Sequence, residues 1–278
     1  MDNNLENEKI EIDLLIQAIF RKYGYDFRNY AKASLSRRVQ QRLSRSNLKT
    51  ISEMQHKLLY DQSFFETLLL DLTINVTEMF RDPYFFKAIR TSVIPELKRQ
   101  PFIKVWHAGC SSGEEVYSMA ILLKEEGVAQ TARIYATDTN EAVLQEAEKG
   151  IVSIGKMQQY SRNYMDAGGM SSFSDYYTAR YESALLNKTL RKNVVFSCHN
   201  LVTDGVFGEM DLIICRNVLI YFNDELQNHV FGLFRDSLCP GGFLCLGSKE
   251  SLMFTQCSDD FEIVAEREKI YRKKGKRG

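Results

Sequence analysis

Two glycines and two glutamates follow a run of β-favouring residues and together indicate a ligand-binding turn. The stretch from Val105 to Ala120 reads Val-Trp-His-Ala-Gly-Cys-Ser-Ser-Gly-Glu-Glu-Val-Tyr-Ser-Met-Ala. Gly109 and Gly113 allow the backbone to turn sharply and a ligand to approach it closely. Glu114 and Glu115 fall in the first turn of the helix that follows, where carboxylates are favoured. This is a β-turn-α unit, the part of an open α/β sheet that commonly binds a nucleotide-like ligand.

The two adjacent glutamates narrow the choice of ligand. A pyrophosphate loop presents backbone N–H groups and contains few acids. A neutral or positively charged ligand therefore fits this turn better than a phosphate. The alternative is a strand-to-helix turn whose glutamates only cap the helix, and a short Gly-x-x-x-Gly does not decide between the two.

An aspartate ends the next predicted strand, Arg133-Ile-Tyr-Ala-Thr-Asp138. An acid at this position commonly binds the ribose of a nucleoside, because a carboxylate can accept both hydroxyl protons. The alternative is that Asp138 is the N-cap of a helix predicted over 140–149, and both roles are compatible.

Alternating strands and helices after residue 102 must position these groups, and they predict a mostly parallel sheet. The predicted strands are about 103–108, 133–138, 193–198, 211–216 and 241–247. Segments 261–264 and 269–272 are predicted to close the sheet as an antiparallel hairpin. Residues 150–192 interrupt the alternation and are rich in tyrosine, which indicates an insertion of short antiparallel strands or irregular structure.

The segment before the first strand is too polar for a core and carries Asn75, Thr77 and Arg81. The alternatives to function are turn chemistry for Asn75 and Thr77 and a surface salt bridge for Arg81. Asp82-Pro83 predicts a helix start with Asp82 as N-cap. That helix is predicted to run to about Arg99.

Residues 9–72 have the apolar spacing of a small helical unit. Between residues 21 and 50 there are nine Lys or Arg against one acid, although the whole chain of 278 residues has zero net charge. A helix over about 34–46 is predicted to carry basic residues on its polar side, namely Arg37, Arg38, Arg42 and Arg45. The alternatives are a solvated helix face or a docking surface, and without interleaved aromatic residues an acidic protein partner ranks above nucleic acid.

The amino-acid composition limits the class of protein to which the chain can belong. The chain is 44% hydrophobic, which suits a globular protein of one or two domains. No apolar run approaches the roughly 20 residues needed to cross a bilayer, so no membrane insertion is expected. Six cysteines lie singly, without a Cys-x-x-Cys pair, which predicts reduced thiols, a cytoplasmic location and no metal site.

Taken together, the motifs resemble the S-adenosylmethionine-dependent protein-glutamate methyltransferases of bacterial chemotaxis, the CheR type. The segments that carry the resemblance are Leu35-Ser-Arg-Arg-Val39, Asn75-Val-Thr-Glu-Met-Phe-Arg81, Ala108-Gly-Cys-Ser-Ser-Gly-Glu-Glu115, Ala136-Thr-Asp138, Cys215-Arg-Asn-Val-Leu-Ile-Tyr-Phe222 and Pro240-Gly-Gly242. Their order and spacing extend over nearly the whole chain.

The resemblance implies an α/β fold with a small N-terminal all-helical domain and a Rossmann-like class I methyltransferase domain. The implied boundaries are 1–72 for the helical domain, 73–88 for a linker and the start of a connecting helix, and 89–278 for the methyltransferase domain, with a small β-subdomain inserted at 150–192. It further implies methyl transfer to glutamate carboxylates on the cytoplasmic helical bundle of a chemoreceptor, with S-adenosylhomocysteine as product. A monomer that binds no nucleic acid is expected.

The resemblance also assigns roles to individual residues. Arg81 and Tyr221 would face the incoming glutamate as the catalytic residues. The implied cofactor-binding residues are Asn75, Thr77, Arg81, Glu115, Asp138, Asn200, Leu201, Cys215, Arg216 and Asn217. The implied docking residues for the receptor are Arg37, Arg38, Arg42 and Arg45.

The implied reaction needs no strong base, because the acceptor carboxylate is already ionised at pH 7. His107 and His199 are therefore interpreted as structural residues. Two other classes remain open at this stage. One is a binding module that holds the cofactor or receptor without turnover, and the other is a methyltransferase for RNA or a small molecule.

Overall fold

The computed structural model describes residues 2–73, 77–253 and 255–275. The chain divides into two compact units. The first comprises Met1–Asn75 together with Tyr221–Gln227, and the second comprises Val76–Ile220 together with Asn228–Gly278. Among the described residues, no helix is both long and apolar enough to cross a membrane.

The first unit is all-helical, as its apolar spacing predicts. Its helices are α1 (Asp2–Tyr23), α2 (Lys32–Arg45), α3 (Ile51–Tyr60) and α4 (Gln62–Leu72). The core contains Leu15, Ile19, Val39, Met54 and Leu68, all with no exposed surface. The Thr50 hydroxyl accepts from the Glu53 N–H at 3.1 Å, and the Asp61 carboxylate accepts from the Phe64 N–H at 3.1 Å. Each of these side chains thus caps the N-terminus of its helix, α3 or α4.

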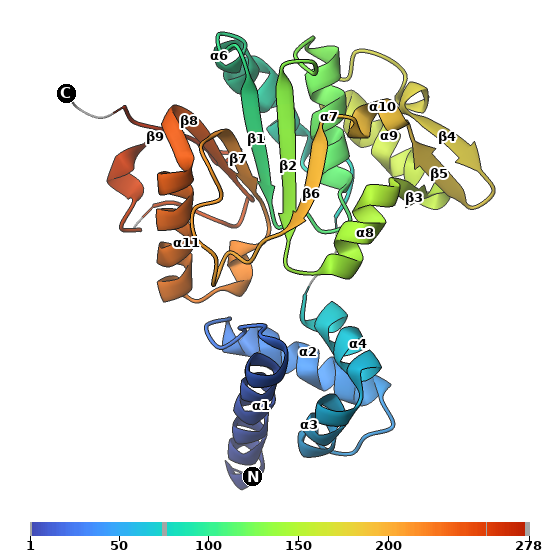
Figure 1. The fold of residues 1–278 in the computed structure, drawn as a ribbon, viewed down its shortest axis with the longest axis vertical. Helices are drawn as coiled ribbons and strands as arrows, with labels where there is room; N and C mark the ends of the chain where they lie inside the picture. The colour runs from blue at the N-terminus through green and yellow to red at the C-terminus, as the bar shows by residue number, and fades with distance from the viewer. Residues whose placement is uncertain (1, 74–76, 254, 276–278) are drawn as a thin grey trace. The chain divides into compact units, whose positions relative to one another are not determined.

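The second unit is built on one seven-stranded sheet of order β6-β2-β1-β7-β8-β10-β9 (Figure 1). Its strands are β1 (Ile103–Ala108), β2 (Ala132–Asp138), β6 (Val194–Cys198), β7 (Met210–Cys215), β8 (Leu238–Leu246), β9 (Phe261–Ala265) and β10 (Ile270–Lys273). The five strands from β6 to β8 pair in parallel, whereas β10 pairs antiparallel with both β8 and β9. The predicted parallel sheet and closing hairpin are confirmed.

Helices flank this sheet and connect its strands. They are α7 (Glu114–Glu125), α8 (Glu141–Lys149) and α11 (Asp224–Ser237), with short turns at η4 (Leu219–Tyr221) and η5 (Ser258–Asp260). The helix predicted from Pro83 to about Arg99 is confirmed as a continuous helical segment to Leu97, which comprises α5 (Pro83–Ala88), the π-helical turn η1 (Ile89–Val93) and α6 (Ile94–Leu97). Pro95 is the second residue of α6, and a proline has no N–H to donate to the preceding turn.

The insertion at 150–192 forms a second, three-stranded antiparallel sheet of order β3-β5-β4. Its elements are β3 (Ile151–Ser153), η2 (Ile154–Lys156), α9 (Met157–Asp166), η3 (Phe173–Tyr176), β4 (Tyr177–Arg180), β5 (Ser183–Leu186) and α10 (Lys188–Arg191). In Figure 1 this small sheet lies on the β6 side of the second unit, away from β8 and β9. The antiparallel strands are as predicted, but helix α9 is an addition that the sequence analysis lacked.

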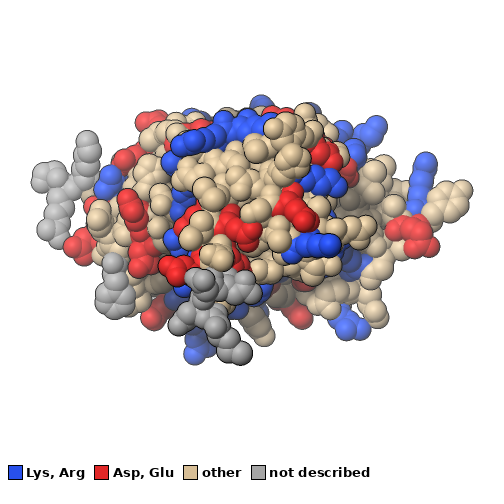
Figure 2. Space-filling model, turned by 90° about the horizontal axis from the view of Figure 1, so that it is seen from below, with Lys and Arg blue, Asp and Glu red and all other residues tan. Residues whose placement is uncertain are grey.

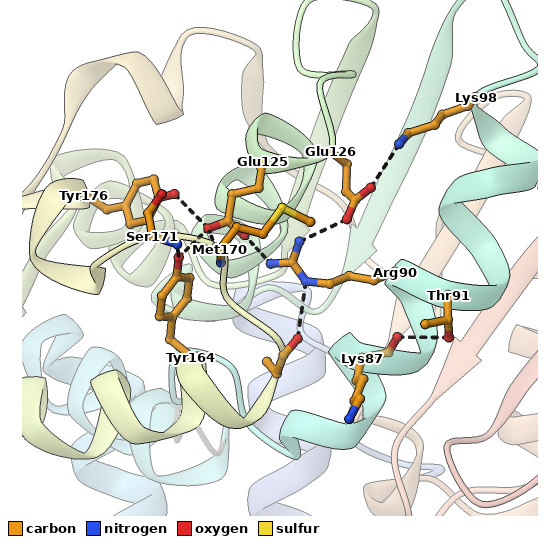
Figure 3. A network of polar contacts seen from close by, with 11 residues as sticks. Lys87, Arg90, Thr91, Lys98, Glu125, Glu126, Tyr164, Met170, Ser171 and Tyr176 are labelled. Carbon is orange, nitrogen blue, oxygen red and sulfur yellow. Dashed lines mark hydrogen bonds and ion pairs between the residues drawn. The ribbon is translucent and has the colours of Figure 1, made fainter.

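A buried carboxylate at the end of α7 holds the insertion in place (Figure 3). Glu125 accepts from the Tyr176 hydroxyl at 2.8 Å, from the Met170 N–H at 3.1 Å and from the Tyr164 hydroxyl, and it forms an ion pair with Arg90 of the π-turn. Burial opposes the ionisation of Glu125, but these hydrogen bonds outweigh it and lower the pKa of the carboxyl group.

Candidate functional site

The turn between β1 and α7 requires glycine at both predicted positions. Gly109 and Gly113 have φ values of +79° and +87°. A Cβ atom at Gly109 would lie 2.5 Å from a Val218 methyl group, and one at Gly113 would lie 2.9 Å from the Ala147 side chain. The chain therefore passes closer to its neighbours here than any side chain would permit.

Ser111, between the two glycines, is also in the left-handed region at φ +51°. Its N–H donates to an Asp138 oxygen at 2.9 Å. Its hydroxyl is buried and lacks a hydrogen-bond partner among the described residues. A buried hydroxyl in this state suits a site that a polar ligand completes.

Asp138, at the end of β2, supports the turn as expected of a ligand-binding acid. Its second oxygen accepts from the Asn140 N–H at 3.0 Å. Burial raises the pKa of Asp138, and the N–H groups of Asn140 and Ser111 oppose this effect. Asp138 is not the N-cap of α8, because the Asn140 side chain takes that role by accepting from the Ala142 N–H at 3.0 Å.

The two adjacent glutamates have different environments. Glu114 is buried and accepts from the Ser112 hydroxyl at 2.7 Å, and burial raises its pKa. Glu115 accepts from Arg216 at 2.6 Å and lies 3.4 Å from the Nδ1 atom of His107. Burial disfavours its charge, but the Arg216 charge and the His107 contact together lower the pKa of Glu115 to about 2. Neither side chain is a simple solvent-facing helix cap.

Arg216 joins the glycine turn to the segment that carries Arg81. Besides Glu115, it forms an ion pair with Asp82 and donates to the Arg81 carbonyl at 3.4 Å. Its guanidinium carbon lies 4.1 Å from the centre of the Phe85 ring. The side chain, which is only 2% exposed, is thus largely occupied by protein partners, and direct contact with a cofactor stays a prediction for Arg216.

Asp82 differs from its predicted role. It precedes α5 at φ +55° and its side chain makes no capping hydrogen bond. Asp82 thus occupies the predicted N-cap position before Pro83, but its carboxylate pairs with Arg216 instead of capping the helix. Arg81 and Thr77 are both half-buried in the same segment, whereas Asn75, the third predicted residue here, lies outside the described residues.

The loop after β7 contains a feature that the sequence analysis missed. The buried carboxylate of Glu250 accepts from the N–H groups of Asn217, Val218, Leu219 and Ile220 at 2.8–3.3 Å, and from the Gly247 N–H at 2.6 Å. A Cβ atom at Gly247 would lie 2.8 Å from the Asn217 nitrogen. In the sequence, only Gly247 at the end of a predicted strand, with Glu250 three residues later, indicated this arrangement.

The predicted adenine-side residues lie after β6. Leu201 is buried, and the Asn200 side chain accepts from the Val202 N–H at 2.9 Å, which shapes the loop. His199 packs edge-on against Trp106 with ring centres 5.3 Å apart, and the Trp106 indole donates to Thr137 at 2.9 Å. An aromatic cluster thus lies next to this loop. Cys215, also predicted to line the cofactor, is buried in β7.

The four arginines predicted to form a docking surface do not share one exposed face. Arg38 is only 4% exposed, donates to the Leu72 carbonyl and to the Ser34 hydroxyl, and lies 4.4 Å from the Tyr221 ring centre within the first unit. Burial lowers its pKa. The expected position of Arg38 on the solvent-facing side is therefore wrong, because a long side chain can turn inward from the edge of a helix face.

The other three arginines differ in exposure. Arg42 is half-buried and forms an ion pair with Asp71, whereas Arg37 and Arg45 are exposed. Figure 2 shows basic side chains in a band near the upper margin of its view and acidic side chains around the centre, so that face carries both signs of charge.

Two family descriptions match the chain. "CheR methyltransferase, SAM binding domain" matches residues 75–270, and "CheR methyltransferase, all-alpha domain" matches residues 10–73. The chain is 53% identical to "Putative methyltransferase Cher3" of Pseudomonas putida over 96% of this chain and 98% of that protein. It is 30% identical to a "Chemotaxis protein methyltransferase" of Listeria monocytogenes, over 85% of this chain and 88% of that protein.

A "Chemotaxis protein methyltransferase 1" of Vibrio cholerae is 34% identical over 69% of this chain and 70% of that protein. The glycine turn, the acid after β2 and the unpartnered Ser111 hydroxyl suit the nucleoside and amino acid parts of S-adenosylmethionine. The chain belongs to the CheR methyltransferase family and is an S-adenosylmethionine-dependent methyltransferase.

Proposed function

We propose that the protein transfers the methyl group of S-adenosylmethionine to glutamate side-chain carboxylates on the cytoplasmic helical bundle of a chemoreceptor. The products are glutamate methyl esters and S-adenosylhomocysteine. The observation that carries the proposal is the position of Arg216, which pairs with Glu115 beside the glycine turn and with the Arg81–Asp82 segment. The names of the Listeria and Vibrio relatives support the assignment to chemotaxis.

The chemistry places modest demands on the protein. The cofactor supplies an activated methyl group on a sulfonium cation, and the acceptor carboxylate is already ionised at pH 7. A general base is not needed. The remaining work is to align the two reactants and to remove water from the carboxylate, which are both effects of positioning and burial.

Residues of the glycine turn are assigned to the cofactor. Asp138 is held by the Ser111 and Asn140 N–H groups with both oxygens oriented, and it would accept the ribose hydroxyl protons. Glu115 is kept ionised by Arg216 and His107 beside the turn. Glu114 is buried with a raised pKa, so a nearby ammonium group would favour its charged form.

Arg81 is assigned to the acceptor. A guanidinium group can orient a carboxylate through two parallel N–H donors. One acceptor oxygen must keep a free lone pair, because that oxygen attacks the methyl group. Tyr221, the last residue of η4, is assigned to donate to the other oxygen.

Receptor docking is assigned to the exposed arginines of α2, Arg37 and Arg45. An acidic helical bundle would meet these side chains as rim charges, which accelerate association and set specificity more than they add affinity. Arg38 and Arg42 are not assigned to docking, because the first is buried and the second is only 16% exposed in its ion pair with Asp71. Arg45 lies 3.9 Å from the same carboxylate, but 58% of its side chain is exposed.

The test is transfer of a tritiated methyl group from S-adenosylmethionine to purified receptor cytoplasmic fragments. Glutamate methyl esters release volatile methanol on mild alkaline treatment, whereas N-methyl groups and methylated nucleic acid do not. We expect base-labile transfer with the wild-type protein and its loss with Arg81→Ala. Calorimetry with S-adenosylhomocysteine on both proteins verifies that the cofactor site is intact. Base-stable label, label in RNA, or no transfer by a protein that binds S-adenosylhomocysteine would refute the proposal.

A further inference from the structure

The backbone that carries Arg81 adopts an unfavourable conformation on both sides of this residue. Phe80 and Asp82 have φ values of +52° and +55°, in the left-handed region. A bulky residue such as phenylalanine rarely adopts this conformation, and it persists only where the surrounding structure holds it. The contacts of residues 79–82 therefore fix the backbone position from which the Arg81 side chain extends.

Three of these contacts come from elements already assigned to the cofactor side. The buried Phe80 N–H donates to the Ser118 hydroxyl at 2.8 Å, and that hydroxyl donates to the Glu114 carbonyl at 2.7 Å. Arg216 donates to the Arg81 carbonyl at 3.4 Å and pairs with Asp82. Helix α7 and the end of β7 thus hold one side of the turn.

Further contacts come from the inserted segment. The Asn163 amide of α9 donates to the Met79 carbonyl at 3.1 Å, and Asn163 is only 7% exposed. Its amide oxygen accepts from Gln159 at 2.8 Å, so the NH₂ group is the one that faces Met79. The Phe80 ring packs edge-on against Tyr164 with ring centres 5.3 Å apart. The insertion therefore contacts the turn through both backbone and side chain.

Helix α9 is also anchored by contacts with residues outside this turn. Tyr164, the residue after Asn163, donates to Glu125 of α7 and accepts from the Ser171 N–H at 2.8 Å (Figure 3). Arg90 donates to the Ala167 carbonyl at 3.3 Å and pairs with Glu125. Because these contacts fix α9 against α7, Asn163 is held in place whether or not it bonds to Met79.

We propose that Asn163 is a positioning residue for Arg81, through which the inserted segment sets the geometry of the acceptor site. The inference rests on the proposed function, in which Arg81 orients the acceptor carboxylate. It extends that function because the insertion would then affect the rate of methyl transfer through the position of Arg81. A misplacement of a reacting group by about 1 Å can reduce a rate by about 100-fold, so loss of this hydrogen bond should act mainly on kcat.

The primary variant is Asn163→Asp, which keeps the shape of the side chain but replaces the donor with an oxygen that repels the Met79 carbonyl. The matched control is Asn187→Asp. Asn187 lies in the same insertion and donates to the Asp175 carbonyl at 2.7 Å, and it is not among the contacts of residues 79–82. Both variants are assayed against receptor cytoplasmic fragments at a temperature where circular dichroism shows them folded.

We expect Asn163→Asp to lower kcat by about 10- to 100-fold, with the dissociation constant of S-adenosylhomocysteine changed by less than about threefold, on the order of 0.6 kcal/mol. Asn187→Asp should leave both values near wild type. Hydrogen exchange should also increase in peptides spanning residues 79–86 of Asn163→Asp, and not in peptides from α8. A purely structural role would instead lower thermal stability without this split between kcat and cofactor affinity.

A second variant, Asn163→Ala, removes the donor without adding repulsion and keeps the test decisive if the aspartate variant unfolds. Wild-type kcat and unchanged exchange at residues 79–86 in a folded Asn163 variant would overturn the inference. If the wild-type protein methylates no receptor fragment, the proposed function fails. Hydrogen exchange then still determines whether Asn163 holds the turn, because that measurement needs no acceptor.

Discussion

Arg38 in the first unit and Arg216 in the second are both buried, and both lie against an aromatic ring, yet their charges are balanced differently. Arg216 meets two carboxylates, Glu115 and Asp82. Arg38 donates to the Leu72 carbonyl and the Ser34 hydroxyl, and burial lowers its pKa. Arg216 links two segments of the candidate site through ion pairs. Arg38 instead joins α2 to the end of α4 through hydrogen bonds to uncharged oxygens.

This difference explains why a charge pattern on a helix was a poor guide to function. The spacing of Arg38 placed it on a basic face, but spacing alone does not determine whether a guanidinium turns toward water or inward. Arg216 follows directly after β7, where the carboxyl edge of a parallel sheet commonly forms a ligand site. Strand position was therefore more informative than charge density.

The largest effect should come from removing each arginine in turn. Arg216→Met leaves Glu115, whose side chain is 16% exposed, without its main partner, and we expect a loss of about 3 kcal/mol in the free energy of unfolding. Arg38→Met removes no partner of a buried carboxylate and should cost about 2 kcal/mol or less. Guanidinium unfolding followed by circular dichroism measures both.

Arg235→Met is the control for this pair, because the Arg235–Asp236 bridge is partly exposed and such a bridge contributes about 0–1 kcal/mol. Equal losses for Arg216→Met and Arg38→Met would show that the two arginines are compensated alike, and the comparison would fail.

Next in size is the effect of Asp138 on the cofactor. Asp138→Ala removes a carboxylate proposed to accept two hydroxyl protons, each worth about 1.5–3 kcal/mol, so S-adenosylhomocysteine should bind at least about 100-fold more weakly by calorimetry. Asp211→Ala is the control, since its carboxylate likewise accepts a backbone N–H, from Lys104 at 2.8 Å. Unchanged affinity in Asp138→Ala would remove the ribose assignment.

The free energy of unfolding at acidic pH should test the Arg216–Glu115 ion pair. The pKa of Glu115 is lowered to about 2 in the folded protein from an ordinary value of 4.5. Because the pKa of Glu115 is lower in the folded than in the unfolded protein, its ionised carboxylate stabilises the fold fully above the unfolded pKa. This contribution is lost as the pH falls from about 5 toward 2. The upper limit of this contribution is about 3 kcal/mol.

Glu115→Gln should therefore be less stable than wild type at pH 7, and the difference should shrink as the pH approaches 3. Urea unfolding at a series of pH values measures it. A difference that does not change with pH would mean that Glu115 is not held ionised by Arg216 and His107.

The smallest effect concerns the exposed arginines. Reversing Arg37 and Arg45 to glutamate should change the free energy of unfolding by less than about 1 kcal/mol. It should reduce kcat/KM for receptor fragments by about 3- to 10-fold at low salt, because screening weakens surface charges. Arg42→Glu, which opposes Asp71, should instead lower stability first. Unaltered receptor kinetics in the double variant would exclude docking through α2.

The parts of the fold that were predictable are those determined within a short stretch of chain. The glycine turn, the strand before it and the helix after it depend on neighbouring residues, and the structure confirms them. The Glu250 contacts and the Asn163–Met79 bond join residues about 30 and 84 apart in sequence. Such pairs depend on which strands and helices become neighbours, and no local pattern encodes that.

The Glu125 contacts have a consequence for how insertions in this family can be exchanged between members. An insertion transplanted without hydroxyls equivalent to Tyr164 and Tyr176 would leave a buried carboxylate with too few donors beside Arg90. Recombination at the visible edges of the segment, residues 150 and 192, would therefore cut across a cooperative group. We expect this insertion to be exchanged in evolution only together with α7 and the π-turn. A chimera should therefore transfer the insertion, α7 and the π-turn as one unit.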